Sequence, residues 1–424
     1  MGYLREAAKK RGVPLVDLIV RATRELGRKT TLLAVCPNSE AVARAAVLAA
    51  READAPMLYA ATLNQVDLDG GYTGWTQRDL VALVSDFCRD YGFDGDVAVC
   101  SDHYGPYCKD RHTIEKWPIE PAMWGVGASL VAAMQAGYDL LHVDPTIDGT
   151  LPKGEHISIE TVAERTVRLI SQVERFRRSG GYPPIGYEVG TEEVHGGLAD
   201  METFRKFLEM LKEGLAERGL SDVWPIFVVA KVGTDLHTSE FDPGVASGAV
   251  AEAGKYGSFI KGHYTDNCTN LEAYPEAGMG GANVGPEFTM TEYDALMGLV
   301  EEEAALVSEG GAEPSGFKDA LTGAVVESGR WKKWLTDEEE GREFSDLAPD
   351  RREWLTKTGC RYIWTAPEVL SARRRLYENL SAAGTDADAR VVEAIAASVR
   401  KYVEKFNLRG LTSQLVEAIE EGRA

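Results

Sequence analysis

Eight short apolar runs, separated by longer segments with helical spacing, most constrain what this chain can fold into. Strands that are apolar along their whole length are typical of parallel sheets covered by helices on both faces. Eight strand and helix units in series predict an α/β fold, a closed (β/α)8 TIM barrel. No G-x-G-x-x-G follows the first run to favour an open, doubly wound sheet. The runs are TTLLAVCP, PMLYAAT, VAVCSDH, LLHVDPT, IGYEVGT, PIFVVAKV, SFIKGHY and GANVGP.

The segments between the runs have the period of amphipathic helices. In residues 158–176 the face that we expect to be buried consists of Val162, Leu169, Val173 and Phe176. The segment before the eighth run, residues 270–281, contains Pro275 and several glycines. We therefore expect only a short or irregular element there.

The chain continues for more than a hundred residues after the eighth unit, with further helical patterns and no strand pattern. We therefore divide it into two parts. Residues 1–310 form the barrel with an N-terminal helical lead-in, and residues 311–424 form a C-terminal helical extension packed on the barrel.

The charge balance excludes some classes of partner. Lys and Arg total 46 against 67 Asp and Glu, which gives a formal net charge of −21. Such a charge opposes binding to nucleic acid or to an anionic membrane surface. The six cysteines have no C-x-x-C spacing, and no apolar run approaches the roughly 20 residues of a membrane span. We expect a cytoplasmic protein with free thiols.

Polar side chains stand at the carboxyl ends of the predicted strands, where a TIM barrel carries its active site. Four of the seven histidines fall there. Three imidazoles converging from separate strands suit zinc or another first-row divalent ion, which could act as a Lewis acid on a bound ketone and hydroxyl. From the third to the seventh strand, these groups are Asp102 and His103, His142 and Asp144, Glu188 and Glu192, Asp235 and His237, and His263 and Asp266.

Two other stretches are candidates for substrate binding. Asn64 and Gln65 follow the second strand, and neutral amides suit polyhydroxylated ligands because they both donate and accept hydrogen bonds. The eighth strand contains Asn283 and ends in Gly285 next to a helix start, and phosphate sites in this fold often use the last loops and a helix N-terminus. Ordinary loop chemistry would also explain both stretches. Asp144 and Asp266 complete our candidate substrate-binding set.

Taken together, the motifs NQV, GGYTG, DHYGP, HVDPT, TVAER, GTE, DLHT, GHYTDN and NVGP resemble one family. It comprises the accessory, or Z-type, subunits of the class II D-tagatose-1,6-bisphosphate aldolases. The motifs come in the family's order over about residues 55–295, and RWKKWL and CRYIW are weaker echoes nearer the C-terminus.

The resemblance implies roles for single residues, because class II aldolases hold a divalent metal with three histidines. Matched motif by motif, His103, His237 and His263 would be the metal ligands, and Asp102 would transfer a proton. Glu192 lies in the GTE motif, and either it or Glu188 would serve as a base or ligand. Zinc is the expected metal, with manganese, nickel or cobalt as alternatives.

One departure bears on the substrate. The G-x-S-G that helps class II aldolases to hold a phosphate is absent, and HYTDN stands in its place. This weighs against a bisphosphate and toward a less phosphorylated ketose of the fructose or tagatose type.

Three functions stay open: aldol cleavage between carbons 3 and 4, epimerisation at carbon 4 by the same bond cleavage, and a non-catalytic subunit that stabilises a separate aldolase. The expected partner is accordingly a sugar or sugar phosphate, and the protein would be a homo-oligomer or bind a catalytic aldolase subunit.

Overall fold

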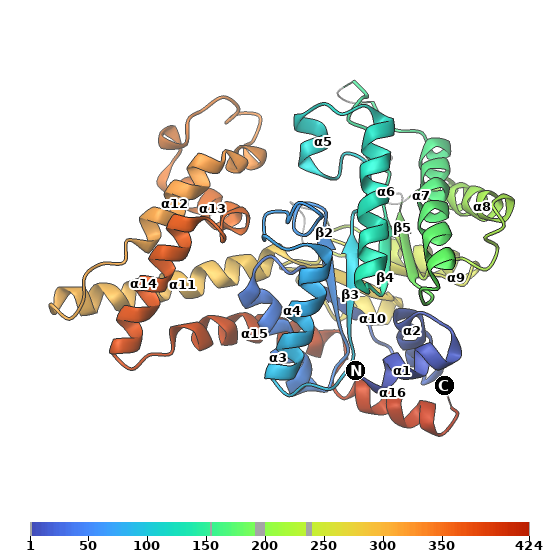
Figure 1. Ribbon diagram of the computed structural model, residues 1–424, viewed down its shortest axis with the longest axis horizontal. Coiled ribbons are helices and arrows are strands. Elements are labelled where there is room, and N and C mark those ends of the chain that lie inside the picture. Colours follow the sequence, from blue (N-terminus) through green and yellow to red (C-terminus); the bar gives the residue numbers. More distant parts are fainter. Residues whose placement is uncertain (1, 153–154, 191–199, 235–239, 424) are drawn as a thin grey trace.

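The eight predicted strands form a closed parallel barrel (Figure 1). The computed structural model describes residues 2–152, 155–190, 200–234 and 240–423. Neighbouring strands pair in chain order, and β1 closes the barrel by pairing with β8. This confirms the predicted TIM barrel. The strands are β1 (Leu32–Val35), β2 (Met57–Thr62), β3 (Val97–Asp102), β4 (Leu140–Val143), β5 (Gly186–Gly190), β6 (Phe227–Val229), β7 (Phe259–Gly262) and β8 (Gly281–Val284).

Helices alternate with these strands and surround the barrel. Two further helices, α1 (Tyr3–Arg11) and α2 (Leu15–Glu25), precede β1. The helix before β8 has only five residues, as its proline and glycines predict. The helices after β1 are α3 (Glu40–Ala53), α4 (Gln77–Asp90), α5 (Asp110–Ile114), α6 (Ile119–Ala136), α7 (Ile159–Gly180), α8 (Met201–Glu217), α9 (Pro243–Gly254), α10 (Ala273–Ala277) and α11 (Pro286–Ser308).

Local sequence explains where several of these helices begin. The Ser39 and Ser158 side chains accept backbone N–H groups in the first turns of α3 and α7. Thr76 and Asp79 form a reciprocal capping box at the start of α4. One detail of the sequence prediction is wrong: Phe176 near the end of α7 is 40% exposed, and the guanidinium of Arg175 lies over its ring.

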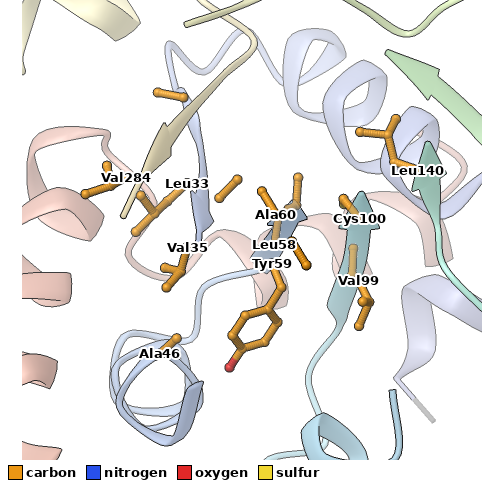
Figure 2. Packing of buried hydrophobic residues seen from close by; sticks show 14 of the residues in the cluster. Leu33, Val35, Ala46, Leu58, Tyr59, Ala60, Val99, Cys100, Leu140 and Val284 are labelled. Atoms are coloured by element: carbon orange, nitrogen blue, oxygen red, sulfur yellow. The ribbon is translucent and has the colours of Figure 1, made fainter. Parts of the chain in front are cut away.

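Buried apolar side chains of β1, β2, β3 and their covering helices pack together in the core (Figure 2). Tyr59 extends from β2 toward α3, where its hydroxyl donates to the carbonyl of Ala43. Burying one of the Val or Leu side chains of this core stabilises the fold by about 1.5–3 kcal/mol. This packing supports the strands whose carboxyl ends carry the site.

The C-terminal region is helical, as predicted. Its first helices lie beside the outer part of α11, and α15 and α16 return to the barrel (Figure 1). The return is hydrogen-bonded: Gly410 N–H donates to Ala53, and Thr31 N–H to Phe406. The elements are α12 (Phe317–Ser328), η1 (Arg330–Trp334), η2 (Phe344–Asp346), α13 (Pro349–Gly359), η3 (Cys360–Tyr362), α14 (Pro367–Ala382), α15 (Ala387–Lys405) and α16 (Leu411–Glu420).

Within the described ranges, no helix combines the length and apolar character needed to cross a lipid bilayer.

Candidate active site

The turn after β3 brings His103 to the centre of the barrel's carboxyl end. His103 has a positive φ of 49°, an uncommon conformation for a residue with a side chain. Gly105 follows, and a Cβ at this position would lie 1.5 Å from the carbonyl oxygen of Asp144. Only glycine permits this approach between the β3 and β4 ends. The DHYGP sequence therefore builds a tight turn that presents the imidazole inward.

Three imidazoles gather at this point. The ring centroids of His103, His142 and His263 lie 4.7–5.2 Å from one another. The Nε2 atom of His103 and the Nδ1 atom of His263 face each other at 3.1 Å. His142 of β4 and the residues that directly follow β3 and β7 thus form one cluster, because parallel strands of a barrel end on the same face.

Carboxylates hold the outer nitrogens of two of these rings. His103 Nδ1 is 2.6 Å from Asp144 Oδ2, and His263 Nε2 is 3.0 Å from Glu188 Oε1. Such contacts are usual for metal-binding histidines, because they orient the ring and place the proton of a neutral imidazole on the outer nitrogen. Burial opposes the charged form of His103, but Asp102 and Asp144 raise its pKa to about 9.

The cluster fits a divalent metal ion. One candidate ligand atom from each of Asp102, His103, His142 and His263 lies within 4.8 Å of the others. Two nitrogens bound to tetrahedral zinc at about 2.0–2.1 Å stand about 3.3 Å apart, close to the spacing of the facing His103 and His263 atoms. The buried Nε2 of His142 has no hydrogen-bond partner among the described residues.

Asp102 lies at the edge of this cluster and lines the cavity described below. Its Oδ1 accepts a hydrogen bond from Asn283 Nδ2 at 3.0 Å and lies 3.3 Å from His142 Nδ1. Burial opposes ionisation of Asp102, but the charges of His103 and His263 hold its pKa well below the usual range. Asp102 is therefore an anion at neutral pH.

Glu188 is completely buried beneath the cluster. Its carboxylate pairs with Lys261 at 2.6 Å as well as with His263. Burial opposes its charge, yet Lys261 and His142 lower the pKa of Glu188 to about 2. The enclosed carboxylate is ionised and holds His263 in its orientation. The role of Glu188 as a base or ligand stays a prediction.

A cavity of about 590 Å³ opens in front of the imidazoles. Asp102, His103 and His263 line it. The six predicted substrate-binding residues also line it: Asn64, Gln65, Asp144, Asp266, Asn283 and Gly285. Their direct contact with substrate stays a prediction, and their present partners differ.

Asn283 has the most available polar group of the six, because its buried Oδ1 has no partner within the described structure. Both ends of the Gln65 amide are already used: Oε1 accepts from Thr62 N–H at 2.7 Å, and Nε2 donates to Asn38 Oδ1 at 2.5 Å. Asn64 donates to the Cys108 carbonyl at 2.9 Å. Gln65 and Asn64 thus shape the cavity wall, whereas Asn283 is ready to accept from a ligand.

The N-terminus of α11 is occupied by a side chain of the protein. Asp266 accepts the N–H groups of Gly285 at 2.9 Å and Glu287 at 2.8 Å. Burial raises the pKa of Asp266 to about 6. The helix start that suggested a phosphate site is therefore already capped by a carboxylate.

Two predicted residues, the metal ligand His237 and the catalytic candidate Glu192, lie outside the described residues. Sequence reasoning placed His142 at a strand end without making it a ligand, although the structure brings it into the cluster. It also missed the outer wall of the cavity, which comes from the C-terminal region. RWKKWL and CRYIW, the weak echoes there, were the available signal.

Comparison with known proteins shows the family of the chain. The family of D-tagatose-1,6-bisphosphate aldolase subunits of the GatZ/KbaZ-like type matches residues 16–419. The chain belongs to this family. The family match thus includes the C-terminal helices as well as the barrel.

A curated relative is the D-tagatose 6-phosphate 4-epimerase of Agrobacterium fabrum, 28% identical over 381 residues, which are 85% of this chain and 86% of the relative. Among solved structures, a probable tagatose 6 phosphate kinase from Sinorhizobium meliloti 1021 superposes with a TM-score of 0.69 and 22% identity, over 93% of this chain and 99% of that one. The fructuronate-tagaturonate epimerase UxaE from Cohnella laeviribosi gives a TM-score of 0.55 and 10% identity, over 90% and 82%. The two solved structures establish the shared fold.

Proposed function

We propose that this protein is a divalent-metal-dependent 4-epimerase of a ketose 6-phosphate of the tagatose and fructose type. The observation that carries the proposal is the cluster of three imidazoles beside the ionised Asp102, of which His103 and His263 line the cavity together with Asp102. The name of the Agrobacterium relative supports the substrate class. Zinc is the proposed metal, with manganese, nickel or cobalt as alternatives.

The ion would be held by His103 and His263, with His142 or His237 as further ligands. When bound, it supplies Lewis-acid stabilisation of negative charge on the ketose oxygens. Asp144 and Glu188 hold the two histidine rings in the orientation that this requires.

Asp102 moves the proton. Its carboxylate accepts the proton of the carbon-4 hydroxyl, the carbon 3 to carbon 4 bond breaks, and its electron pair passes into an enediolate while carbon 4 becomes an aldehyde. The aldehyde then rotates, so that carbon 3 attacks the opposite face of carbon 4. Asp102 returns the proton to the oxygen on carbon 4, which becomes the new hydroxyl. Asn283 keeps Asp102 in position through its amide donor. If the aldehyde left instead, the same residues would perform an aldolase reaction.

Metal analysis and product analysis on one preparation test the proposal. The purified protein is assayed for metal content and incubated with tagatose 6-phosphate, fructose 6-phosphate and the corresponding 1,6-bisphosphates, before and after chelation. We expect near-stoichiometric metal and chelator-sensitive interconversion of the two 6-phosphates. Asp102→Asn should retain metal and lose at least about 10²-fold in kcat, whereas the exposed control Asp94→Asn should match the parent.

If three-carbon products formed, the proposed activity would be that of an aldolase and not of an epimerase. Absence of metal binding and of turnover on every sugar would refute the enzyme proposal and support the non-catalytic subunit. A search for a catalytic aldolase that this chain stabilises would then follow.

A further inference from the structure

The outer wall of the cavity is built by two segments of the C-terminal region. The η1 segment contributes Arg330, Lys333 and Trp334, and the η3 segment contributes Arg361 and Tyr362. Three of these five side chains are cationic, in a chain with a net charge of −21. A local excess of positive charge that lines a cavity attracts anions into that cavity.

Arg361 is the least compensated of the three cations. It is only 8% exposed, and its guanidinium carbon lies 4.8 Å from the centre of the Trp334 ring and 5.1 Å from that of Tyr362. Its buried Nε has no acceptor, and no carboxylate in the described structure pairs with it. Burying an unpaired cation is unfavourable, so the stacked aromatic rings stabilise an arrangement that an anion would complete.

Arg330 adds a second positive charge at the same aromatic ring. Its guanidinium carbon lies 4.1 Å from the centre of the Tyr362 ring. The Nε of Arg330 and the Nε1 of Trp334 are also buried without an acceptor among the described residues. Together with Arg361 Nε, three N–H donors of one wall lack an acceptor.

The charges of this wall are only partly balanced. Arg330 and Lys333 share the single carboxylate of Asp110, with Lys333 Nζ at 2.6 Å from Oδ1. Within this wall, three cations face the one carboxylate of Asp110. Asp266 of the barrel also lines the cavity, and the charge of Arg361 lowers its pKa against the larger effect of burial. A phosphate monoester carries about −1.5 to −2 at neutral pH and offers three acceptor oxygens.

The barrel itself offers no equivalent place among the described residues. The N-terminus of α11, where this fold often binds phosphate, is capped by Asp266. The groups that line the cavity next to the imidazoles include the carboxylates Asp102 and Asp144. An anionic end of the substrate is therefore attracted away from these groups and toward the C-terminal wall.

We propose that Arg361, assisted by Arg330 and Lys333, binds the terminal phosphate of the ketose and selects phosphorylated substrates. This inference rests on the proposed function for the identity of the sugar, but not for the binding of the anion. Arginine suits the task because its planar fork can donate two hydrogen bonds to one phosphate.

The test compares Arg361→Gln with the parent in two assays. Calorimetry measures binding of inorganic phosphate and of tagatose 6-phosphate to each protein. Kinetics measures kcat/KM for tagatose 6-phosphate and for unphosphorylated tagatose. The matched control is Arg352→Gln, because Arg352 also has a buried Nε without a partner but does not line the cavity.

We expect Arg361→Gln to weaken binding of phosphate at least tenfold and to lower kcat/KM for tagatose 6-phosphate about 10²- to 10³-fold, mainly through KM. Activity on unphosphorylated tagatose and the metal content should stay within about threefold of the parent. Arg361→Lys should fall between the parent and Arg361→Gln, because it keeps the charge without the fork. Circular dichroism and the melting temperature establish that each variant is folded.

Equal losses on both sugars, or unchanged phosphate affinity in a folded Arg361→Gln protein, would overturn the inference and leave the epimerase proposal intact. A loss confined to a ketose with a terminal carboxylate would overturn the choice of phosphate. If the parent turned over no sugar but bound phosphate in an Arg361-dependent way, the proposed function would fail while the anion site stood.

Discussion

The two walls of the cavity treat charge in opposite ways. On the barrel wall, the charged groups come in closely paired sets: Glu188 lies between Lys261 and His263, and Asp144 binds His103. On the C-terminal wall, cations outnumber carboxylates, and Arg361 is stacked on aromatic rings instead of paired. A site that must hold its groups in fixed orientations is balanced internally, whereas a site that binds a charged ligand is completed by that ligand.

The largest effect on activity should come from a substitution in the imidazole cluster of the barrel wall. We expect His103→Ala to lose metal and to lower kcat/KM at least about 10³-fold, because the substitution removes a proposed metal ligand that also lies beside Asp102. The loss should be the same for phosphorylated and unphosphorylated sugar, unlike that of Arg361→Gln. Elemental analysis and kinetics measure both effects.

The exposed His156 provides the matched control for that substitution. His156→Ala should keep the metal and the activity of the parent. Full activity of a metal-free His103→Ala protein would contradict the proposal that the barrel wall performs the reaction while the C-terminal wall binds the anion.

A smaller effect, on folding stability, should follow from separating the buried pair of the barrel wall. Lys261 and Glu188 are both 0% exposed, and Lys261→Met leaves Glu188 without its cation. We expect a loss of about 3–5 kcal/mol in the free energy of unfolding, measured with denaturant. The added change Glu188→Gln should recover part of it, because no buried charge then remains unpaired.

Lys333→Met on the C-terminal wall is the comparison for this pair. The Lys333 side chain is 48% exposed in its ion pair with Asp110, so water screens the interaction. We expect a change below about 1 kcal/mol. Equal losses for Lys261→Met and Lys333→Met would contradict the difference between the walls.

An effect on stability that depends on pH should come from Asp266, which caps α11 and also feels the positive charge of Arg361. Its pKa is raised by burial from 3.8 to about 6, so the folded protein binds the proton more tightly than the unfolded chain. The contribution of Asp266 to stability is therefore full below about pH 4 and is lost as the pH rises through 6. At about 1.4 kcal/mol for each unit, the loss is on the order of 2–3 kcal/mol.

Asp266→Asn keeps an oxygen that can accept both N–H groups but does not titrate. Melting temperatures of the ligand-free proteins should therefore diverge between pH 4 and 6, with the variant gaining relative to the parent as the pH rises. Parallel curves for the two proteins would contradict the raised pKa.

The repeated strand and helix pattern was enough to predict the barrel, because hydrophobic period is a local property of the chain. The convergence of His103 and His263 followed from it, since parallel strands in a barrel end on one face. His142 was harder to assign as a ligand, because nothing in a single strand separates a metal-binding imidazole from one that is simply buried. The balance of Glu188 by Lys261 depends on side chains 73 residues apart.

The sequence was sufficient to predict the barrel, and it led to the hypothesis that Asp102 and the histidines at the carboxyl ends of the strands carry the chemistry. The C-terminal side chains across the cavity from these residues could be assigned from the folded structure alone. Arg330 meets Asp110 across 220 residues of chain, and such pairings depend on how α11 and the helices after it fold back. Local patterns specify the elements, but the charge that faces a ligand is set by long-range packing, which no local pattern contains.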